Sequence, residues 1–167
     1  MTTLTLQPVD FDDPRQTADF LFLLDHYMRG PTGSGEPMGD ELRARLPEAL
    51  RRRPTVLSYL AYAGGDDGQP QPAGLINCVE GFSTFAGKPL LNIHDIVVHE
   101  DFRRRGIARA LLAHAEAVAR ERGCCKLTLE VLEGNRGAHR AYLDFGFTAY
   151  QLDPAMGAAM FMEKKLG

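Results

Sequence analysis

The sequence has few cysteines and no long apolar run. No segment of its 167 residues approaches the roughly 20 apolar residues of a membrane-spanning helix, and the start of the chain lacks the basic-then-apolar pattern of a secretory signal. Cys78, Cys124 and Cys125 are too few for a disulfide framework, so we interpret them as buried free thiols. These absences predict a cytoplasmic protein with no membrane partner.

Neither an excess of positive charge nor a metal-ligand spacing is present. The formal net charge is -3 at pH 7, whereas proteins that bind nucleic acid through its phosphates usually present a basic face. The run Arg51–Arg53 before Pro54 is interpreted as a solvated helix end. The five histidines do not recur at metal-ligand spacing beside cysteines or carboxylates. We therefore expect no nucleic-acid partner and no metal.

Length and composition indicate one domain over residues 1–167. With 44% hydrophobic residues, a chain of this length can bury one substantial core. Hydrophobic periodicity predicts helices over residues 13–30, from Asp40 onward, over 107–122 and over 135–144. Asp13, followed by Pro14 at the first helical position, is expected to cap the first of these helices, and Asp40 the second. Alternation predicts strands around residues 4–6 and over 55–63, 73–82, 90–98, 125–131 and 158–164.

The predicted helix 107–122 connects two strands. Its apolar stripe is formed by Ile107, Leu111, Ala115 and Val118. The order strand, helix, strand implies a parallel crossover, whereas the short links between the earlier strands favour antiparallel pairing. The sequence therefore predicts the α/β class, in the form of a mixed α+β sheet with flanking helices.

A basic loop opens this helix, with the sequence Arg103-Arg104-Arg105-Gly106-Ile107-Ala108. A helix N-terminus has unpaired N–H groups and a partial positive charge, so it can bind a phosphate. Gly106 lets the backbone approach such a ligand, and the arginines add planar cations that suit phosphate oxygens. The pattern indicates an anion site, with a solvated basic turn as the alternative.

A second motif lies further along, in the run NRGAHRAYLDFGF of residues 135–147. Together the two motifs resemble the GNAT superfamily of N-acetyltransferases. Three residues match the family's phosphate-binding signature, namely Arg103, Gly106 and Ala108, while Arg104 stands where the family often has Gly. The later motif is matched by Asn135, Ala138, Tyr142, Gly146 and Phe147. The stretch at His94 and Asp95 also looks like the polyamine and diamine acetyltransferase branch.

The resemblance implies acetyl-CoA as cofactor and a mostly antiparallel central sheet with a splayed parallel pair. The pyrophosphate is expected on the loop formed by Arg103, Arg104, Arg105, Gly106, Ile107 and Ala108. The pantetheine arm is expected to pair with the backbone of Ile96, Val97 and Val98, as a peptide adds to a sheet edge. Asn135, Ala138 and Tyr142 complete the expected cofactor contacts, Asn135 also being able to cap its helix. Family members often pair as dimers, so a homodimer is implied as well.

Acetyl transfer to an amine requires a neutral nucleophile, an acid for the departing thiolate and donors for the oxyanion. The resemblance assigns the acid to Tyr142, whose phenol, with an ordinary pKa near 10, carries a proton at neutral pH. For the base, strict alternation would send His94 and Asp95 to opposite faces, with His94 on the face of Asn92 and Ile96. An imidazole pKa near 6.5 suits the base, so we predict His94. Asp95 as base, Asp95 as a structural hydrogen-bond acceptor and a water chain stay open.

Five residues are candidates for an acceptor pocket in which carboxylates hold a cationic amine and aromatic rings hold its stem: Tyr27, Glu36, Glu80, Phe82 and Phe85. The sequence predicts transfer of an acetyl group from acetyl-CoA to a primary amine of a small molecule. Two alternatives remain, a non-catalytic acyl-CoA-binding sensor or interaction module and a peptide N-terminal acetyltransferase. The identity of the amine does not follow from the residues.

Overall fold

The computed structural model describes residues 4–65 and 68–166. The chain forms two compact units, Met1–Leu129 and Glu130–Gly167. None of the helices within the described residues is long and apolar enough to cross a membrane. The single domain over 1–167 stays a prediction.

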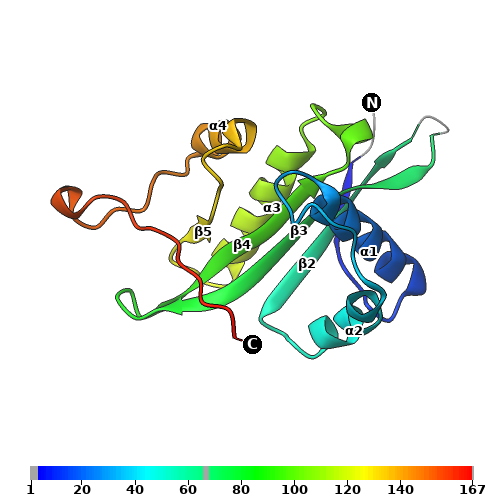
Figure 1. The fold of residues 1–167 in the computed structure, drawn as a ribbon, viewed down its shortest axis with the longest axis horizontal. Helices are drawn as coiled ribbons and strands as arrows, with labels where there is room; N and C mark the ends of the chain where they lie inside the picture. The colour runs from blue at the N-terminus through cyan, green and yellow to red at the C-terminus, as the bar shows by residue number, and fades with distance from the viewer. Residues whose placement is uncertain (1–3, 66–67, 167) are drawn as a thin grey trace. The chain divides into compact units, whose positions relative to one another are not determined.

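The first unit contains a five-stranded sheet and three α-helices (Figure 1). In chain order its elements are β1 (Thr5–Pro8), α1 (Pro14–Arg29), α2 (Asp40–Arg51), β2 (Val56–Gly64), β3 (Pro70–Ser83), β4 (Lys88–Val98), the 3-10 turn η1 (Glu100–Phe102), α3 (Ile107–Glu121) and β5 (Leu127–Leu129). The strand order is β1-β2-β3-β4-β5, antiparallel throughout except for the parallel pair β4 and β5. The predicted mixed sheet and its parallel crossover are confirmed.

The helix ends follow from local chemistry. Asp13 caps α1 by accepting from the Arg15 N–H at 2.8 Å. The predicted cap of α2 is wrong by one position, because Gly39 is the cap residue and Asp40 lies in the first turn, where a carboxylate favours the helix dipole. Pro47 lies inside α2 without ending it.

The two faces of the sheet carry different helices (Figure 1). On the first, Phe20 and Leu23 of α1 pack in one buried cluster with Leu60, Leu75 and Val97 of the strands, and α2 covers the same cluster. On the second, a Cβ at Gly74 would lie 3.0 Å from Ile107 and 3.1 Å from Leu111 of α3. Consecutive strand residues point to opposite faces, so Leu75 lies on the face that α1 covers, and Gly74 on the face that α3 covers. We call these the α1 face and the α3 face.

The second unit contains α4 (Arg136–Phe145) and the 3-10 turn η2 (Pro154–Met156). The predicted strand over 158–164 is wrong, since those residues form no strand. The apolar run there has the composition of a strand but no neighbouring strand to pair with, and pairing is what makes a strand. The predicted strand over 125–131 is shorter than expected, with three residues in β5. The three cysteines are free thiols, but only Cys78 is buried; the expected burial is wrong for Cys124, which is half-buried, and for Cys125, which is exposed ahead of β5.

Candidate functional site

A β-bulge interrupts β4 at His94. Asn77 of β3 pairs with Asp95, and the next residue, Cys78, pairs with Ile93, so His94 is an extra residue on β4. Paired residues share a face, so Asp95 lies on the face of Asn77, and Asn92 lies there too through its pairing with Val79.

The predicted alternation along β4 is therefore wrong. Asn92 and Asp95 both lie on the α1 face, whereas Ile96, paired with Ile76, lies on the α3 face. The inserted residue shifts the period of two by one position, so residues before and after it no longer alternate as one series. His94 and Asp95 were expected on opposite faces of the sheet. Asp95 instead lies on the α1 face, and His94 contacts Asn92 of that same face.

A hydrogen-bond chain leads from β5 to His94. The Asn92 Nδ2 donates to Thr128 Oγ1 at 3.0 Å, and the Asn92 Oδ1 lies 3.0 Å from His94 Nδ1. The His94 side chain is exposed, whereas Asn92 and Thr128 are half-buried. The ring is thus held from one side, with Nε2 directed away from the Asn92 amide.

A second chain leads from β2 to Asp95. Ser58 Oγ donates to Asn77 Oδ1 at 2.7 Å, and Asn77 Nδ2 donates to Asp95 Oδ2 at 3.0 Å. Ser58 and Asn77 are buried polar groups that satisfy one another. Asp95 is therefore a structural hydrogen-bond acceptor, one of the two roles considered for it, with Oδ1 left outside the hydrogen bonds found among the described residues.

Tyr27 of α1 approaches this carboxylate. Burial, and after it the charge of Asp95, raise the pKa of the Tyr27 phenol above its ordinary value. The same two causes raise the pKa of Cys78 to about 12. Both groups keep their protons at neutral pH, so neither adds a charge near Asp95.

Among the residues that the structure describes, no strand pairs with the β5-facing edge of β4 beyond Ile93. β5 pairs only with Leu91, Asn92 and Ile93, while β3 follows β4 to Val98. Because the His99 N–H donates to the Ala73 carbonyl of β3, ladder alternation directs the backbone groups of Val97 to β3 and those of Ile96 and Val98 to the open side. Of the predicted trio, Ile96 and Val98 can pair with an extended ligand and Val97 cannot.

The loop Arg103–Ala108 joins this edge to α3. Gly106 is the cap residue of α3, with φ of 78°, and no side chain caps the first N–H groups of the helix. Arg104 also has a positive φ, 61°, which explains why glycine suits its position. Arg103 Nε donates to the Val98 carbonyl at 3.4 Å, and Arg105 stacks 5.1 Å from the centre of the Phe102 ring. The helix thus presents open donors beside three exposed cations.

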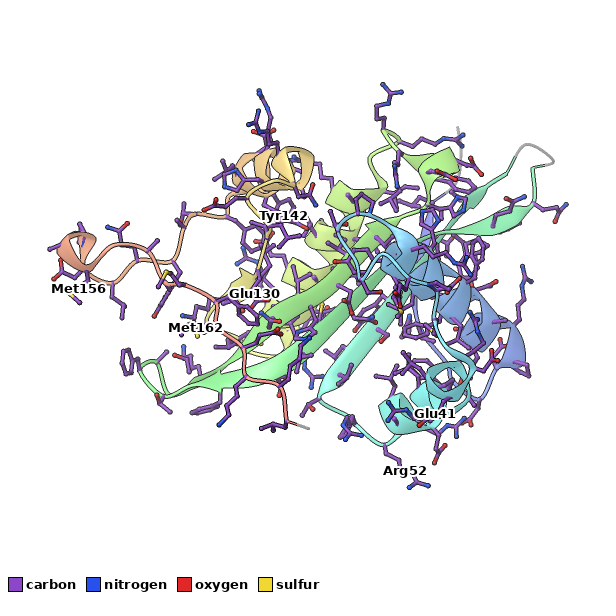
Figure 2. The ribbon with its side chains drawn as sticks, in the orientation of Figure 1. Glu41, Arg52, Glu130, Tyr142, Met156 and Met162 are labelled. Atoms are coloured by element: carbon purple, nitrogen blue, oxygen red, sulfur yellow. The ribbon has the colours of Figure 1, made fainter. Side chains whose placement is uncertain are left out.

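The second predicted motif forms α4 and the turn after it. Asn135 caps α4 by accepting from the Ala138 N–H at 3.2 Å. Tyr142 is half-buried and lies on α4 (Figure 2). Its ring centre is 5.9 Å from that of Phe147. Gly146, with φ of 112°, ends the helix, and the Phe147 N–H donates to the Tyr142 carbonyl at 3.0 Å. The cap and the Gly-Phe turn are present as expected.

The five acceptor candidates do not form one cluster. Tyr27 borders Asp95, and Glu36 is exposed in the loop between α1 and α2. Glu80 forms an ion pair with Arg122, which follows α3, so its charge is already matched. The aromatic rings are 64% exposed for Phe82 and 89% exposed for Phe85, at the β3–β4 hairpin. The register places that hairpin seven residues along β4 from Asp95, a span of roughly 23 Å.

Sequence reasoning missed Asn92, Asn77 and the aspartate that anchors the α1–α2 loop. Asp25 Oδ1 accepts from the Met38 N–H at 2.6 Å, and Arg29 and Arg43 flank the carboxylate. Burial acts in the opposite direction, but the Met38 N–H and Arg29 lower the pKa of Asp25. Asparagine inside a strand is uncommon, and that is the signal by which Asn77 and Asn92 could have been found.

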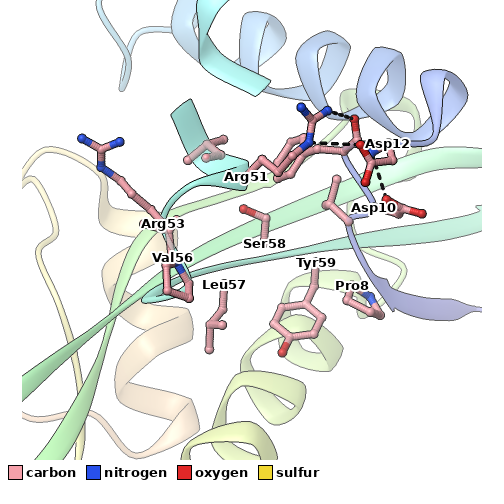
Figure 3. A pocket seen from close by; sticks show the side chains of 13 residues that line it. Pro8, Asp10, Asp12, Arg51, Arg53, Val56, Leu57, Ser58 and Tyr59 are labelled. Atoms are coloured by element: carbon pink, nitrogen blue, oxygen red, sulfur yellow. Dashed lines mark hydrogen bonds and ion pairs between the residues drawn. The ribbon is translucent and has the colours of Figure 1, made fainter. Parts of the chain in front are cut away.

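A cavity of about 340 Å³ lies elsewhere in the first unit, between the end of α2 and the start of β2 (Figure 3). Arg51 closes it, with Nε 3.1 Å from Asp12 Oδ1 and Nη2 donating to the Phe11 carbonyl at 2.8 Å. Of its charged lining residues, Arg51 and Asp12 are thus paired with each other, and Arg53 donates to the Ala49 carbonyl. Within residues 4–65 and 68–166, no group of three or more histidine, cysteine or acidic side chains could hold a metal ion.

Parts of the chain are similar in sequence to known acetyltransferases. The chain is 46% identical over 66 residues to streptothricin acetyltransferase of Streptomyces lavendulae, covering 40% of this chain and 35% of the relative. It is 31% identical over 87 residues to thialysine N-epsilon-acetyltransferase of Caenorhabditis elegans, covering 52% of this chain and 51% of the relative. The chain thus spans about a third to a half of these two curated relatives.

Solved structures share the fold over nearly the whole chain. A probable acetyltransferase superposes with a TM-score of 0.75 at 22% identity, covering 98% of this chain and 99% of that one. The aminoglycoside N-acetyltransferase AAC(6')-Iy in complex with CoA gives 0.73 at 16% identity, covering 99% and 97%. The model of the acetyltransferase (GNAT) family matches residues 21–147. Since that match covers most of the chain, the protein belongs to the acetyltransferase (GNAT) family.

Proposed function

We propose that this protein transfers an acetyl group from acetyl-CoA to a primary amine of a small molecule. The observation that carries the proposal is the adjacency, within the first unit, of a free strand edge and an uncapped helix N-terminus. Ile96 and Val98 direct backbone groups to that edge, and the loop at Gly106 follows it in the chain. An extended ligand with a phosphate at one end fits both features.

For the cofactor, Gly106 and the first N–H groups of α3 would hold the pyrophosphate. Arg103, Arg104 and Arg105 would add positive charge around it, and Ile107 and Ala108 supply the helix backbone. The pantetheine amides would pair with Ile96 and Val98. Asn135, Ala138 and Tyr142 remain proposed contacts from the second unit.

In the proposed reaction, the substrate ammonium first gives a proton to His94 Nε2. The neutral nitrogen then attacks the thioester carbonyl carbon, the C–N bond forms and the C–S bond breaks. Sulfur leaves with the bonding electron pair and takes a proton from the Tyr142 hydroxyl. The nitrogen then loses its second proton, which restores the Tyr142 hydroxyl, and His94 gives its proton to water. The products are an N-acetyl amine, free thiol and one proton.

For the acceptor, we propose that Asp95 contacts the ammonium group and that Tyr27 contacts its stem. Glu36, in the loop between α1 and α2, is a further proposed contact. Two relatives, streptothricin acetyltransferase and thialysine N-epsilon-acetyltransferase, are named for small-molecule amines, which favours such an amine over a peptide N-terminus. Glu80, already paired with Arg122, and the hairpin rings of Phe82 and Phe85 have less support. The homodimer and the cytoplasmic location stay predictions.

An acceptor panel tests the proposal. The protein is incubated with acetyl-CoA and, separately, a polyamine, an amino acid, an aminoglycoside, streptothricin and a short peptide, and free thiol is measured. Thiol release that depends on a small amine, with the acetylated product seen by mass spectrometry, is expected. Acetyl-CoA binding without acetylation of any amine would favour the sensor module, and activity confined to the peptide would favour the N-terminal acetyltransferase.

A further inference from the structure

We infer that Asn92 and Thr128 are positioning residues that hold His94 in its Nδ1–H tautomer, so that Nε2 is the nitrogen that takes a proton. The kinetic part of this inference rests on the proposed acetyltransferase function. Its structural part concerns the free protein and can be measured without any substrate.

The direction of the Asn92 amide carries the inference. Its NH₂ group donates to Thr128 Oγ1 at 3.0 Å, which leaves the carbonyl oxygen for His94 Nδ1, also at 3.0 Å. An amide oxygen accepts hydrogen bonds and never donates them, so Nδ1 must carry the hydrogen. A neutral imidazole then has its lone pair on Nε2.

The bulge makes this support necessary. His94 is the extra residue of the β3–β4 ladder and its side chain is exposed, so neighbouring strands do not hold the ring by packing. An exposed imidazole without a partner samples several rotamers and both tautomers. The Asn92 contact restricts it to one arrangement, and Thr128 restricts Asn92.

Few groups around this part of β4 titrate between pH 6 and 9. Asp95 adjoins His94 on β4, Tyr27 faces Asp95 from α1, and Cys78 lies on β3; β5 contributes no titratable residue. The raised pKa of Tyr27 and that of Cys78 keep both groups neutral in this range. Neither of these two groups therefore changes the charge beside His94 in this range.

Nuclear magnetic resonance of the ¹⁵N-histidine-labelled protein tests the structural part. The chain has five histidines, and a His94→Gln variant assigns the signal. The expected spectrum at high pH shows a protonated Nδ1 and an unprotonated Nε2 for His94, with the Nδ1–H preference lost in Asn92→Leu and weakened in Thr128→Val. An Nε2–H tautomer in the wild type would overturn the inference.

The pH dependence of kcat/KM tests the kinetic part. In Asn92→Asp the new carboxylate favours the imidazolium form, so we expect the pKa of His94 to rise by about one unit. The part of the kcat/KM profile that rises with pH should move to higher pH by the same amount. In Asn92→Leu, kcat should fall about tenfold while KM for acetyl-CoA stays unchanged, which is at the modest end for a disturbed proton transfer.

Ser58→Ala is the matched control, because it removes a hydroxyl from the chain that ends at Asp95 and leaves the His94 chain intact. Its profile should keep the wild-type limb, and thermal melting confirms that each variant folds. An Asn92→Asp limb that stays in place while the His94 resonance titrates at higher pH would overturn His94 as base. A resonance that does not shift would overturn Asn92 as its positioning residue.

Discussion

The side-chain amide of Asn77 on β3 lies between two partners, donating to Asp95 on β4 at 3.0 Å and accepting from Ser58 on β2 at 2.7 Å. One buried side chain thus joins three neighbouring strands on the α1 face. The arrangement satisfies both ends of an amide that would otherwise be buried without hydrogen bonds.

Removing this amide should destabilise the fold. We expect Asn77→Ala to lower the free energy of unfolding by about 2 kcal/mol and Ser58→Ala by about 1 kcal/mol, because each leaves a buried polar group unpaired. The double variant should lose less than the sum, since the two side chains form one network. Urea denaturation of the four proteins measures this, and strictly additive losses would contradict the chain.

A glycine at position 104 should stabilise the loop. Arg104 has a φ of 61°, a conformation that costs an L-residue about 1 kcal/mol or more and costs glycine little. We expect Arg104→Gly to raise the free energy of unfolding by roughly 0.5 kcal/mol after the entropy of glycine is counted. Arg105→Gly is the control: its φ is not positive, and it loses the contact with Phe102. Equal effects of the two substitutions on the melting temperature would refute the backbone argument.

Valine substitutions at the two glycines that flank α3 distinguish an effect on cofactor binding from an effect of backbone strain. Gly106 and Gly123 have φ values of 78° and 71°, and no atom lies within 4 Å of a Cβ added at either. Valine at each should therefore cost similar stability. We expect only Gly106→Val to weaken acetyl-CoA binding, by tenfold or more, because it obstructs the N-terminus of the helix. Calorimetry measures both affinities, and parallel losses would remove the loop from the cofactor site.

Tyr142 is tested by removal of one oxygen. Tyr142→Phe should preserve folding and acetyl-CoA affinity while the single-turnover rate of acetyl transfer falls by about 10²-fold, the lower end for a positioned acid. Single-turnover rates are needed because product release can limit steady-state turnover. Equal rates for the two proteins would exclude Tyr142 as the acid and favour water.

The anchor of the α1–α2 loop should be sensitive to acid. The pKa of Asp25 is lowered below its ordinary 3.8, so its contribution to stability is present above that value and is lost as the pH falls through the folded-state pKa. Asp25→Asn should therefore lower the free energy of unfolding at pH 7 by about 1 kcal/mol, a modest figure because Arg29 and Arg43 are partly exposed. The difference from the wild type should vanish in strong acid. A gap that is constant from pH 7 to pH 2 would contradict this origin.

The sequence predicted the elements that local signals define. Asp13 with Pro14 located the start of α1, and the stripe from Ile107 to Val118 gave α3 and hence the parallel crossover. The motif at Asn135 located α4 and its cap. These features depend on residues close together in the chain, so their chemistry can be read directly.

The predictions that are wrong concern contacts between residues that are distant in the sequence. The run NIHDIVV gives no local sign that His94 is an extra residue, because the bulge exists only relative to β3. The pairing of Glu80 with Arg122 depends on how α3 returns to the sheet, and the segment 158–164 has the composition of a strand without a partner. Composition indicates which secondary structure and which side-chain contacts a segment can form. The neighbouring element determines which of these it does form.

The bulge also separates the chemistry of β4 from its packing. Without His94, Ile93 would be followed directly by Asp95, and the ladder with β3 would continue in regular register with Val97 still in the core. Position 94 is therefore a place in this strand where the side chain can be exchanged while the register with β3 and the buried Val97 stay as they are. A change of the proposed base at position 94 leaves the ladder with β3 in place, whereas an exchange at Asp95 removes the carboxylate to which Asn77 donates.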